Sequence, residues 1–152
     1  MFIGVFAVDR LPSRLPPWRP LLLVCNTDPH DRPGEHWVAL YLRIYQGEYF
    51  DSYEREPPLI FRRYLDKHYS RWIMNDKKLQ SVLTRFCGHY CIFYCLYKCL
   101  GYDMRNITNC FVDDATLNDA MVHKFVWGLI NASCLSYCFK NENSLIVCCA
   151  CL

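Results

Sequence analysis

The segment CGHYCIFYCLYKCLGY, residues 87–102, constrains the fold of this 152-residue chain more than any other part of it. Apolar residues would lie on nearly every side of a helix formed by this segment, which predicts a helix buried all round. Gly101 supplies a stop near its end. Such a helix needs other elements around it, and a chain of this length, 53% apolar and 16% aromatic, has enough core for one domain and not for two.

Short apolar strands are predicted ahead of this helix. They occupy residues 4–12, 20–26, 36–44 and 47–53, with a proline-rich loop between the first two. The last two lie so close together in the sequence that an antiparallel hairpin is the simplest arrangement for them.

Helices are predicted for most of the remaining chain. Residues 59–72 have mixed helical periodicity, and Pro58 suits a first turn. A last helix is expected to run to about Ile130, with Asp113 or Asp114 as its N-cap. Because strands come first and helices later, the predicted class is α+β.

Cysteine usage and charge limit the setting in which the protein works. Ten of the eleven cysteines lie in the second half of the chain, and the opening MFIGVFAVDR lacks the charged start and long apolar run of a signal peptide. We therefore expect a reduced, intracellular protein of the nucleus or cytoplasm, not a secreted one. No apolar run approaches the roughly 20 residues that a membrane-spanning helix needs. A net charge of +2 predicts no strong attraction to nucleic acid or anionic membrane.

Cys87 is the strongest candidate for a chemically active residue. It begins the buried helix, where free backbone N–H groups and the positive end of the helix dipole stabilise a thiolate. Gly88 lets a substrate backbone approach closely. A thiolate needs a base, for which His36 at a strand start is the best candidate. The base needs an orienting acceptor, and Asp51 on the next strand is suitable.

The register of the hairpin decides whether His36 and Asp51 meet. A bend at residues 43–44 would place Asp51 directly across from His36, although these residues are poor turn formers. Residues 46–47, Gln-Gly, are a better turn and would place Asp51 nearer Leu42. The sequence leaves both registers open.

An oxyanion donor is also required for this kind of chemistry. The backbone amide of Cys87 is one candidate, and the side-chain amide of Gln80, a few residues upstream, is a plausible second.

The segments that hold these residues resemble the adenovirus-type cysteine protease family, and they are most similar to the versions encoded by Maverick/Polinton elements. The segments are GEHW (34–37), YFDSY (49–53), LQS (79–81) and FCGHYC (86–91). The order His, acid, Gln, Cys is that of the family, and the likeness covers about residues 3–127. Gln80 precedes Cys87 by seven positions, as expected for the family, whereas ubiquitin-like-protein proteases usually have one fewer.

The resemblance implies an adenain-like, papain-like cysteine protease domain over residues 1–130. Its central sheet would be mostly antiparallel and packed against the helix that carries the nucleophile. Family members usually begin with a helix that this sequence is expected to lack. Residues 131–152 form a cysteine-rich tail that has no counterpart in the resemblance.

The resemblance also implies the chemistry. Cys87 would be the nucleophile, His36 the base, Asp51 its orienter, and Gln80 with the Cys87 amide the oxyanion donors, with Trp37 and Gly88 supporting the site. The expected reaction is hydrolysis of peptide bonds in capsid or other precursor proteins. No metal and no cofactor is expected for the chemistry. An activating peptide and DNA are partners that the resemblance allows, and we expect a monomer without a membrane partner.

Two other functions remain open at this point. One is a protease for ubiquitin-like modifiers. The other is an inactive relic of a protease that serves as a binding protein.

Cysteines outside the nucleophile position also need an interpretation. Cys87, Cys91, Cys95 and Cys99 recur every four residues and so share one stripe of the helix. Core packing is favoured over a metal site, because zinc ligands would converge from separate elements. The ending Cys149-Ala150-Cys151-Leu152 formally matches a prenylation box, but no basic stretch precedes it.

Overall fold

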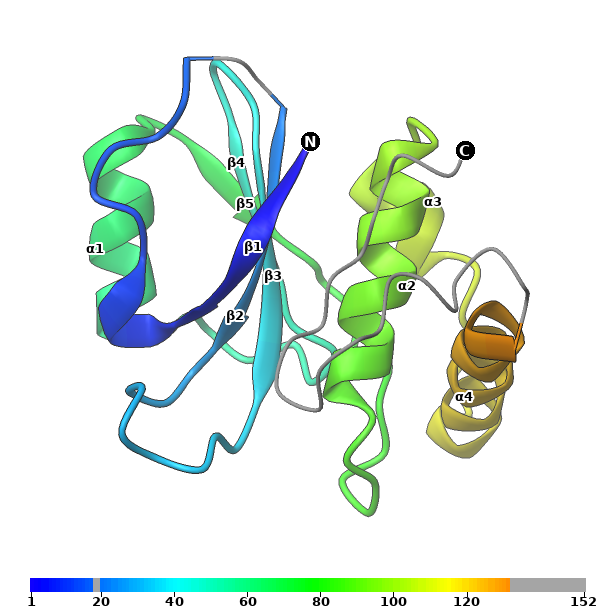
Figure 1. Ribbon diagram of the computed structural model, residues 1–152. Helices are drawn as coiled ribbons and strands as arrows, with labels where there is room; N and C mark the ends of the chain where they lie inside the picture. Colours follow the sequence, from blue (N-terminus) through cyan, green and yellow to red (C-terminus); the bar gives the residue numbers. More distant parts are fainter. Residues whose placement is uncertain (18–19, 132–152) are drawn as a thin grey trace.

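The fold is an α+β arrangement in which one sheet separates two groups of helices (Figure 1). The computed structural model describes residues 1–17 and 20–131, and the predicted cysteine-rich tail with its Cys149 motif lies almost wholly outside them. The elements in chain order are β1 (Phe2–Ala7), the short 3-10 helix η1 (Val8–Arg10), β2 (Leu21–Asn26), β3 (Trp37–Leu42), β4 (Gly47–Phe50), α1 (Leu59–His68), β5 (Trp72–Met74), α2 (Cys87–Cys99), α3 (Met104–Thr108) and α4 (Ala115–Asn131).

The sheet has five strands in the order β1-β2-β3-β4-β5. The two inner pairings, β2 with β3 and β3 with β4, are antiparallel, whereas the two outer pairings are parallel. The sheet is therefore mixed, and the mostly antiparallel sheet expected above needs this correction. The physical reason is the connections: η1 with the loop after it joins β1 to β2, and α1 joins β4 to β5, and such crossovers bring strands back in parallel.

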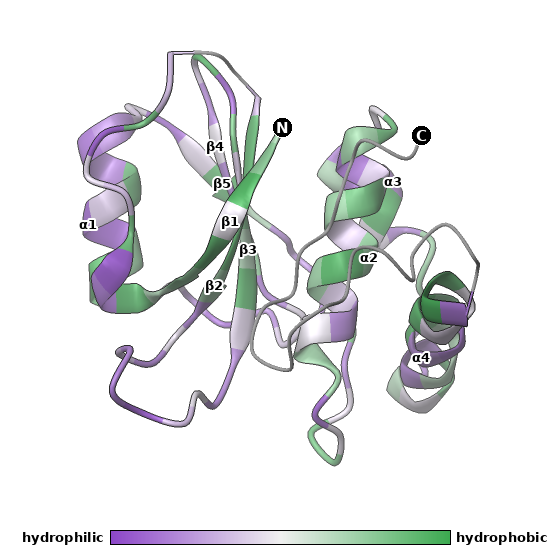
Figure 2. Cartoon of the chain, in the orientation of Figure 1, coloured by the Kyte–Doolittle hydropathy of each residue, from purple (hydrophilic) through white to green (hydrophobic). Residues whose placement is uncertain are grey.

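Helices cover both faces of the sheet, which explains its apolar strands. Alternate residues of β2 and β3 pack on opposite sides, Leu22 and Val24 toward the helix α2, and Leu21 and Leu23 toward α1. Figure 2 shows hydrophobic residues along the inner strands and on the helix sides that face them. A strand buried on both faces has a continuous apolar sequence rather than an alternating one.

The predicted helices need one further correction. The helix expected over residues 59–72 ends at His68, and Trp72–Met74 form the edge strand β5 instead. Gly47 and Trp72 are paired across β4 and β5, so this strand exists because of a contact between distant parts of the chain. The hairpin partner β4 covers only residues 47–50 of the predicted strand.

The buried helix α2 begins at Cys87, as predicted, and the chain turns away at Gly101, whose φ is +91°. The Oδ1 atom of Asp114 accepts hydrogen bonds from the backbone N–H groups of Thr116 (2.9 Å) and Leu117 (3.3 Å), so Asp114 rather than Asp113 caps α4.

The cysteine stripe of α2 packs into the core over most of its length. Cys87, Cys91 and Cys95 are buried, and Cys99 is exposed. Core packing is therefore the right interpretation for Cys91 and Cys95 and wrong for Cys99, whereas Cys87 is buried at the helix start outside that core cluster. Within the described residues, no helix is long and apolar enough to cross a membrane.

Candidate active site

The first turn of α2 brings Cys87 to the start of β3. Cys87 is 6% exposed, and its thiol receives backbone N–H groups of Trp37 on β3 and Gly88 on its own helix. Gly88 has no side chain, and the nearest atom to a Cβ placed there is Cδ1 of Trp37, at 3.9 Å. The helix start and the strand start thus meet at the sulfur.

The hairpin register places His36 beside Asp51. Ala39 pairs with Phe50 and Leu42 with Gly47, and the connection is a loop closed by the Arg43 N–H, which donates to the Gln46 carbonyl. The bend lies between the two alternatives considered above and nearer to the one that brings the pair together. His36 Nε2 lies 2.8 Å from Asp51 Oδ1, and both side chains are buried.

Asp51 is fixed from three sides. Its Oδ1 accepts a hydrogen bond from the backbone N–H of Tyr53 (2.7 Å) as well as from His36. Asn75 holds its main chain: Asn75 Oδ1 accepts from the Asp51 N–H at 2.9 Å, and Asn75 Nδ2 donates to the Asp51 carbonyl at 2.8 Å. This two-sided contact sets where the carboxylate can point.

The other nitrogen of His36 is left for the thiol. Among the described residues, Nδ1 has no hydrogen-bond partner of ordinary geometry although it is buried. The Tyr53 ring packs against the imidazole, with 5.0 Å between ring centroids. A hydrogen bond from Nε2–H to Asp51 fixes the tautomer, so Nδ1 is the nitrogen that can exchange a proton with Cys87.

His36 and Cys87 shift each other's pKa in opposite directions. Burial disfavours the charged imidazole, but the hydrogen bond to Asp51 and the nearby Cys87 outweigh burial and raise the pKa of His36 to about 9. Burial also opposes the Cys87 thiolate, yet His36 and the Trp37 and Gly88 amides lower the pKa of Cys87 below that of an ordinary thiol. Both shifts favour a thiolate beside an imidazolium.

Cys91, one helical turn farther along α2, shows that this effect is local. Burial raises its pKa well above the ordinary value, and the neighbouring Cys95 raises it further. Two cysteines on the same stripe thus have opposite tendencies to ionise, and only the one at the helix start faces a histidine.

Gln80 lies in the loop before α2, and its amide is held at both ends. Its Oε1 accepts a hydrogen bond from the Ser52 hydroxyl at 2.7 Å, and its Nε2 donates to the Thr84 carbonyl at 3.1 Å and lies 3.3 Å from the Thr84 hydroxyl oxygen. The side chain is fully buried. Its role as an oxyanion donor stays a prediction.

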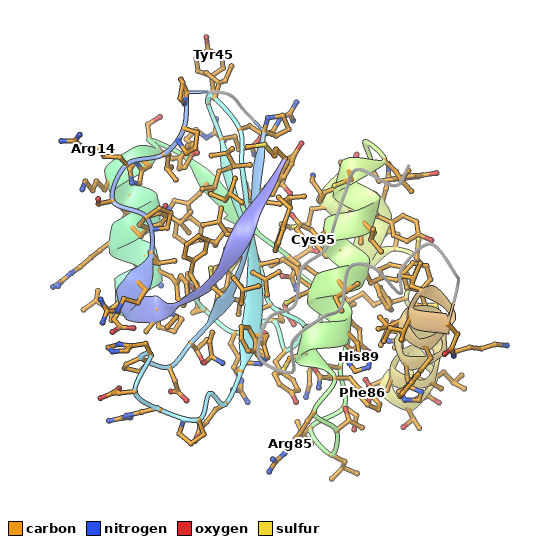
Figure 3. All side chains as sticks on the ribbon, viewed as in Figure 1. Arg14, Tyr45, Arg85, Phe86, His89 and Cys95 are labelled. Atoms are coloured by element: carbon orange, nitrogen blue, oxygen red, sulfur yellow. The ribbon has the colours of Figure 1, made fainter. Side chains whose placement is uncertain are left out.

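His89 is close to Cys87 in sequence but belongs to a different cluster. Its ring lies 4.9 Å from the Phe86 ring and 5.7 Å from that of His123 on α4, measured between centroids. Figure 3 labels Phe86 and His89 at this end of α2, on the side toward α4. His89 thus lies against Phe86 and His123, and it is a poorer candidate for the base than His36.

Asn75 is the site residue that sequence analysis missed, and Tyr53 was noticed only as part of a motif. A single asparagine in a loop carries no pattern, so no signal in one sequence could have found Asn75. For a metal ion, no group of three or more His, Cys, Asp or Glu side chains converges within the described part of the chain.

Comparison with known proteins was informative only at the level of structure. The sequence matches no family model and no curated protein. The selenomethionine crystal structure of the ASFV pS273R protease matches with a TM-score of 0.52 and 22% identity, over 68% of this chain and 43% of that one. A second crystal structure of the same protease matches with a TM-score of 0.51 and 21% identity, over 68% and 42%. The chain thus spans less than half of the length of the protease whose α+β fold it shares.

Proposed function

We propose that this protein is a cysteine endopeptidase that hydrolyses peptide bonds with Cys87, His36 and Asp51. The observation that carries the proposal is the geometry: Cys87 begins α2 beside His36, whose Nε2 lies 2.8 Å from Asp51 Oδ1. The lowered pKa of Cys87 and the raised pKa of His36 agree with it. The shared fold with a viral protease supports the same class of reaction.

Each group has a defined task in the proposed reaction. The Cys87 thiolate attacks the scissile carbonyl carbon, and the C=O π electrons move to the oxygen. The tetrahedral intermediate collapses, the C–N bond breaks, and the leaving amine takes the proton from His36 Nδ1. Water then attacks the thioester while His36 accepts a proton, and the carboxylic acid departs as the thiolate is restored. Asp51 keeps the imidazole oriented throughout.

The oxyanion formed in both steps needs donors. We assign this task to the Cys87 backbone N–H, at the free start of α2, and to an N–H of Gln80. The Gln80 contact with the Thr84 hydroxyl is the longer of its two donor contacts, at 3.3 Å, so this N–H is the less tightly held of the two.

The substrate and setting follow from the sequence resemblance and remain part of the proposal. The proposed substrates are capsid or other precursor proteins of a virus or a Maverick/Polinton-type element, which the enzyme would cleave at small, glycine-containing sites. The chemistry needs no cofactor, an activating peptide and DNA are allowed partners, and the setting is the nucleus or cytoplasm.

Two measurements on the intact chain test the proposal. Glycine-containing precursor peptides and ubiquitin-like fusion proteins are offered as substrates, and iodoacetamide is used to label Cys87 across pH. We expect the peptides to be cleaved, with a bell-shaped dependence of kcat/KM on pH. Its acid limb should lie below the pKa of an ordinary thiol, where Cys87 gains a proton, and its alkaline limb near 9, where His36 loses one.

Each alternative predicts a different result. Cleavage of the ubiquitin-like fusions alone would favour that class of protease. An inactive relic would cleave neither substrate, and its Cys87 labelling would be the same in the His36→Ala variant as in the unaltered protein.

A further inference from the structure

The loop between Gln80 and Cys87 is organised by one residue, Thr84, that the proposed mechanism does not use. The Thr84 carbonyl accepts hydrogen bonds from Gln80 Nε2 (3.1 Å) and from the Tyr53 hydroxyl (3.0 Å). The Thr84 hydroxyl lies 3.3 Å from the same Gln80 nitrogen. Thr84 therefore contacts both the predicted oxyanion donor and the aromatic ring that packs on His36.

Thr84 is itself held by a buried carboxylate from another element. Asp119, on α4, is 3% exposed, and its Oδ2 accepts a hydrogen bond from the Thr84 hydroxyl at 2.8 Å. Its Oδ1 accepts one from the Tyr90 hydroxyl on α2, also at 2.8 Å. A buried carboxylate is costly unless both oxygens are satisfied, and here the two donors fix its orientation.

Tyr90 ties this carboxylate back to the segment that carries Gln80. Its hydroxyl also lies 3.1 Å from the carbonyl of Leu79, the residue before Gln80. The Leu79 and Gln80 N–H groups both donate to the Ser52 carbonyl, at 2.9 and 3.0 Å. The backbone at Gln80 is thus anchored to the segment after β4 and, through Leu79, to α2. The direction of its amide depends on the Ser52 hydroxyl and on the carbonyl and hydroxyl of Thr84.

We propose that Thr84 and Asp119 are a positioning pair that sets the direction of the Gln80 amide toward the oxyanion. The proposal rests on the cysteine protease function proposed above. The Thr84 hydroxyl donates its proton to Asp119 on α4. The lone pairs of the hydroxyl oxygen then face Gln80 Nε2 and limit how far that nitrogen can turn. Because Cys87 and His36 make no contact with the Thr84 hydroxyl, the pair acts on the oxyanion and not on the thiolate.

Two chemical probes separate these effects. Iodoacetamide alkylates Cys87 when the thiolate displaces iodide, and no oxyanion forms. With a peptide aldehyde ending in glycinal, the thiolate attacks the carbonyl carbon and the C=O π electrons move to the oxygen. The resulting alkoxide needs the same hydrogen-bond donors as the oxyanion of the substrate. The ratio of the two reactivities therefore reports on the oxyanion donors.

The variant Thr84→Val removes the hydroxyl and keeps the carbonyl that holds Tyr53. We expect kcat and aldehyde affinity to fall about tenfold, the effect of one misplaced hydrogen bond, with KM and iodoacetamide rate within about twofold. Thr84→Ser should restore kcat, and Asp119→Asn should behave as Thr84→Val does. Glu48→Gln is the control for loss of a buried carboxylate, because Glu48 contacts Lys98 and Tyr94 instead.

Two results would overturn the positioning role. One is an equal fall in alkylation and aldehyde affinity, which is what general loosening of the fold would produce. The other is no change in either probe. If the unaltered protein cleaves no peptide, the proposed function fails, but the two probes still decide whether the Thr84 hydroxyl affects aldehyde addition separately from alkylation.

Discussion

Two buried polar clusters lie at opposite ends of α2, and they differ in how completely their groups are satisfied. At the helix end, Lys98 Nζ lies 3.0 and 3.1 Å from the two carboxylate oxygens of Glu48 and 4.1 Å from the centroid of the Tyr41 ring. Tyr94 donates to the same carboxylate. At the helix start, Asp51 is equally well held, but the buried Nδ1 of His36 faces a thiol without an ordinary hydrogen bond.

The difference agrees with the proposed catalytic role of the cluster at the helix start. Both charges of the Glu48–Lys98 pair have a partner. Neither side chain can move or exchange a proton without breaking these contacts, which is typical of a structural ion pair. The His36–Cys87 pair keeps one exchangeable proton between groups whose pKa values move in opposite directions. We expect substitutions at the helix start to affect rate, and those at its end to affect stability.

The largest effect is expected for Cys87→Ala. Removing the nucleophile should reduce peptide cleavage to the detection limit while the melting temperature hardly changes, because one sulfur at the helix start contributes little packing. Cys91→Ala is the matched control on the same stripe: it should lower stability by about 1 kcal/mol and leave kcat unchanged. Residual cleavage by the Cys87→Ala variant would show that another group is the nucleophile.

Asp51→Asn should reduce kcat by roughly 10²- to 10⁴-fold, because the amide keeps the shape of the carboxylate but does not fix the same imidazole tautomer. Loss of the negative charge should lower the pKa of His36 from about 9 and raise that of Cys87. The thiolate–imidazolium form would then span a narrower pH range. Thiolate ultraviolet absorbance across pH measures the lower limit, and the pH dependence of kcat/KM measures the upper one. An unchanged range would contradict the role given to Asp51.

At the other end of α2, Lys98→Met should cost about 3–5 kcal/mol of unfolding free energy, because Glu48 would remain buried without its cation. Adding Glu48→Gln should recover much of that loss. Denaturant unfolding measures both variants, and kcat per folded molecule should stay the same. A fall in kcat without a fall in stability would mean that the two ends of the helix are coupled.

Part of the fold that carries these clusters was accessible from the sequence, because short-range patterns located the strongest elements. The uniform apolarity of residues 87–102 located α2 and its start at Cys87. The boundary of α1 was missed because Trp72–Met74 continue an apolar, aromatic stretch, and only their pairing with β4 makes them a strand. The mixed sheet was missed for the same reason: both parallel pairings depend on crossovers that leave no local signal.

The site was predicted as a set of residues and not as a geometry. The order of His36, Asp51, Gln80 and Cys87 gave the candidates, but the separation of the first two depended on a turn at residues 43–46 that has no strong turn residues. The charges at the other end of α2 were not predicted as a pair, because Glu48 and Lys98 are far apart in sequence and neither belongs to a motif.

The smallest effect in this comparison is expected at Asn75, which supports Asp51 without touching the imidazole. Asn75→Ala removes the acceptor of the Asp51 N–H and the donor to its carbonyl, so about 1–3 kcal/mol of stability should be lost. Because Tyr53 and His36 still hold the carboxylate, kcat should fall by only about tenfold. Steady-state kinetics and unfolding on the same preparation test this. An intact kcat would mean that the His36 and Tyr53 contacts are enough to position Asp51. A loss as large as that of Asp51→Asn would make Asn75 part of the catalytic geometry, equal in weight to the Asp51 carboxylate.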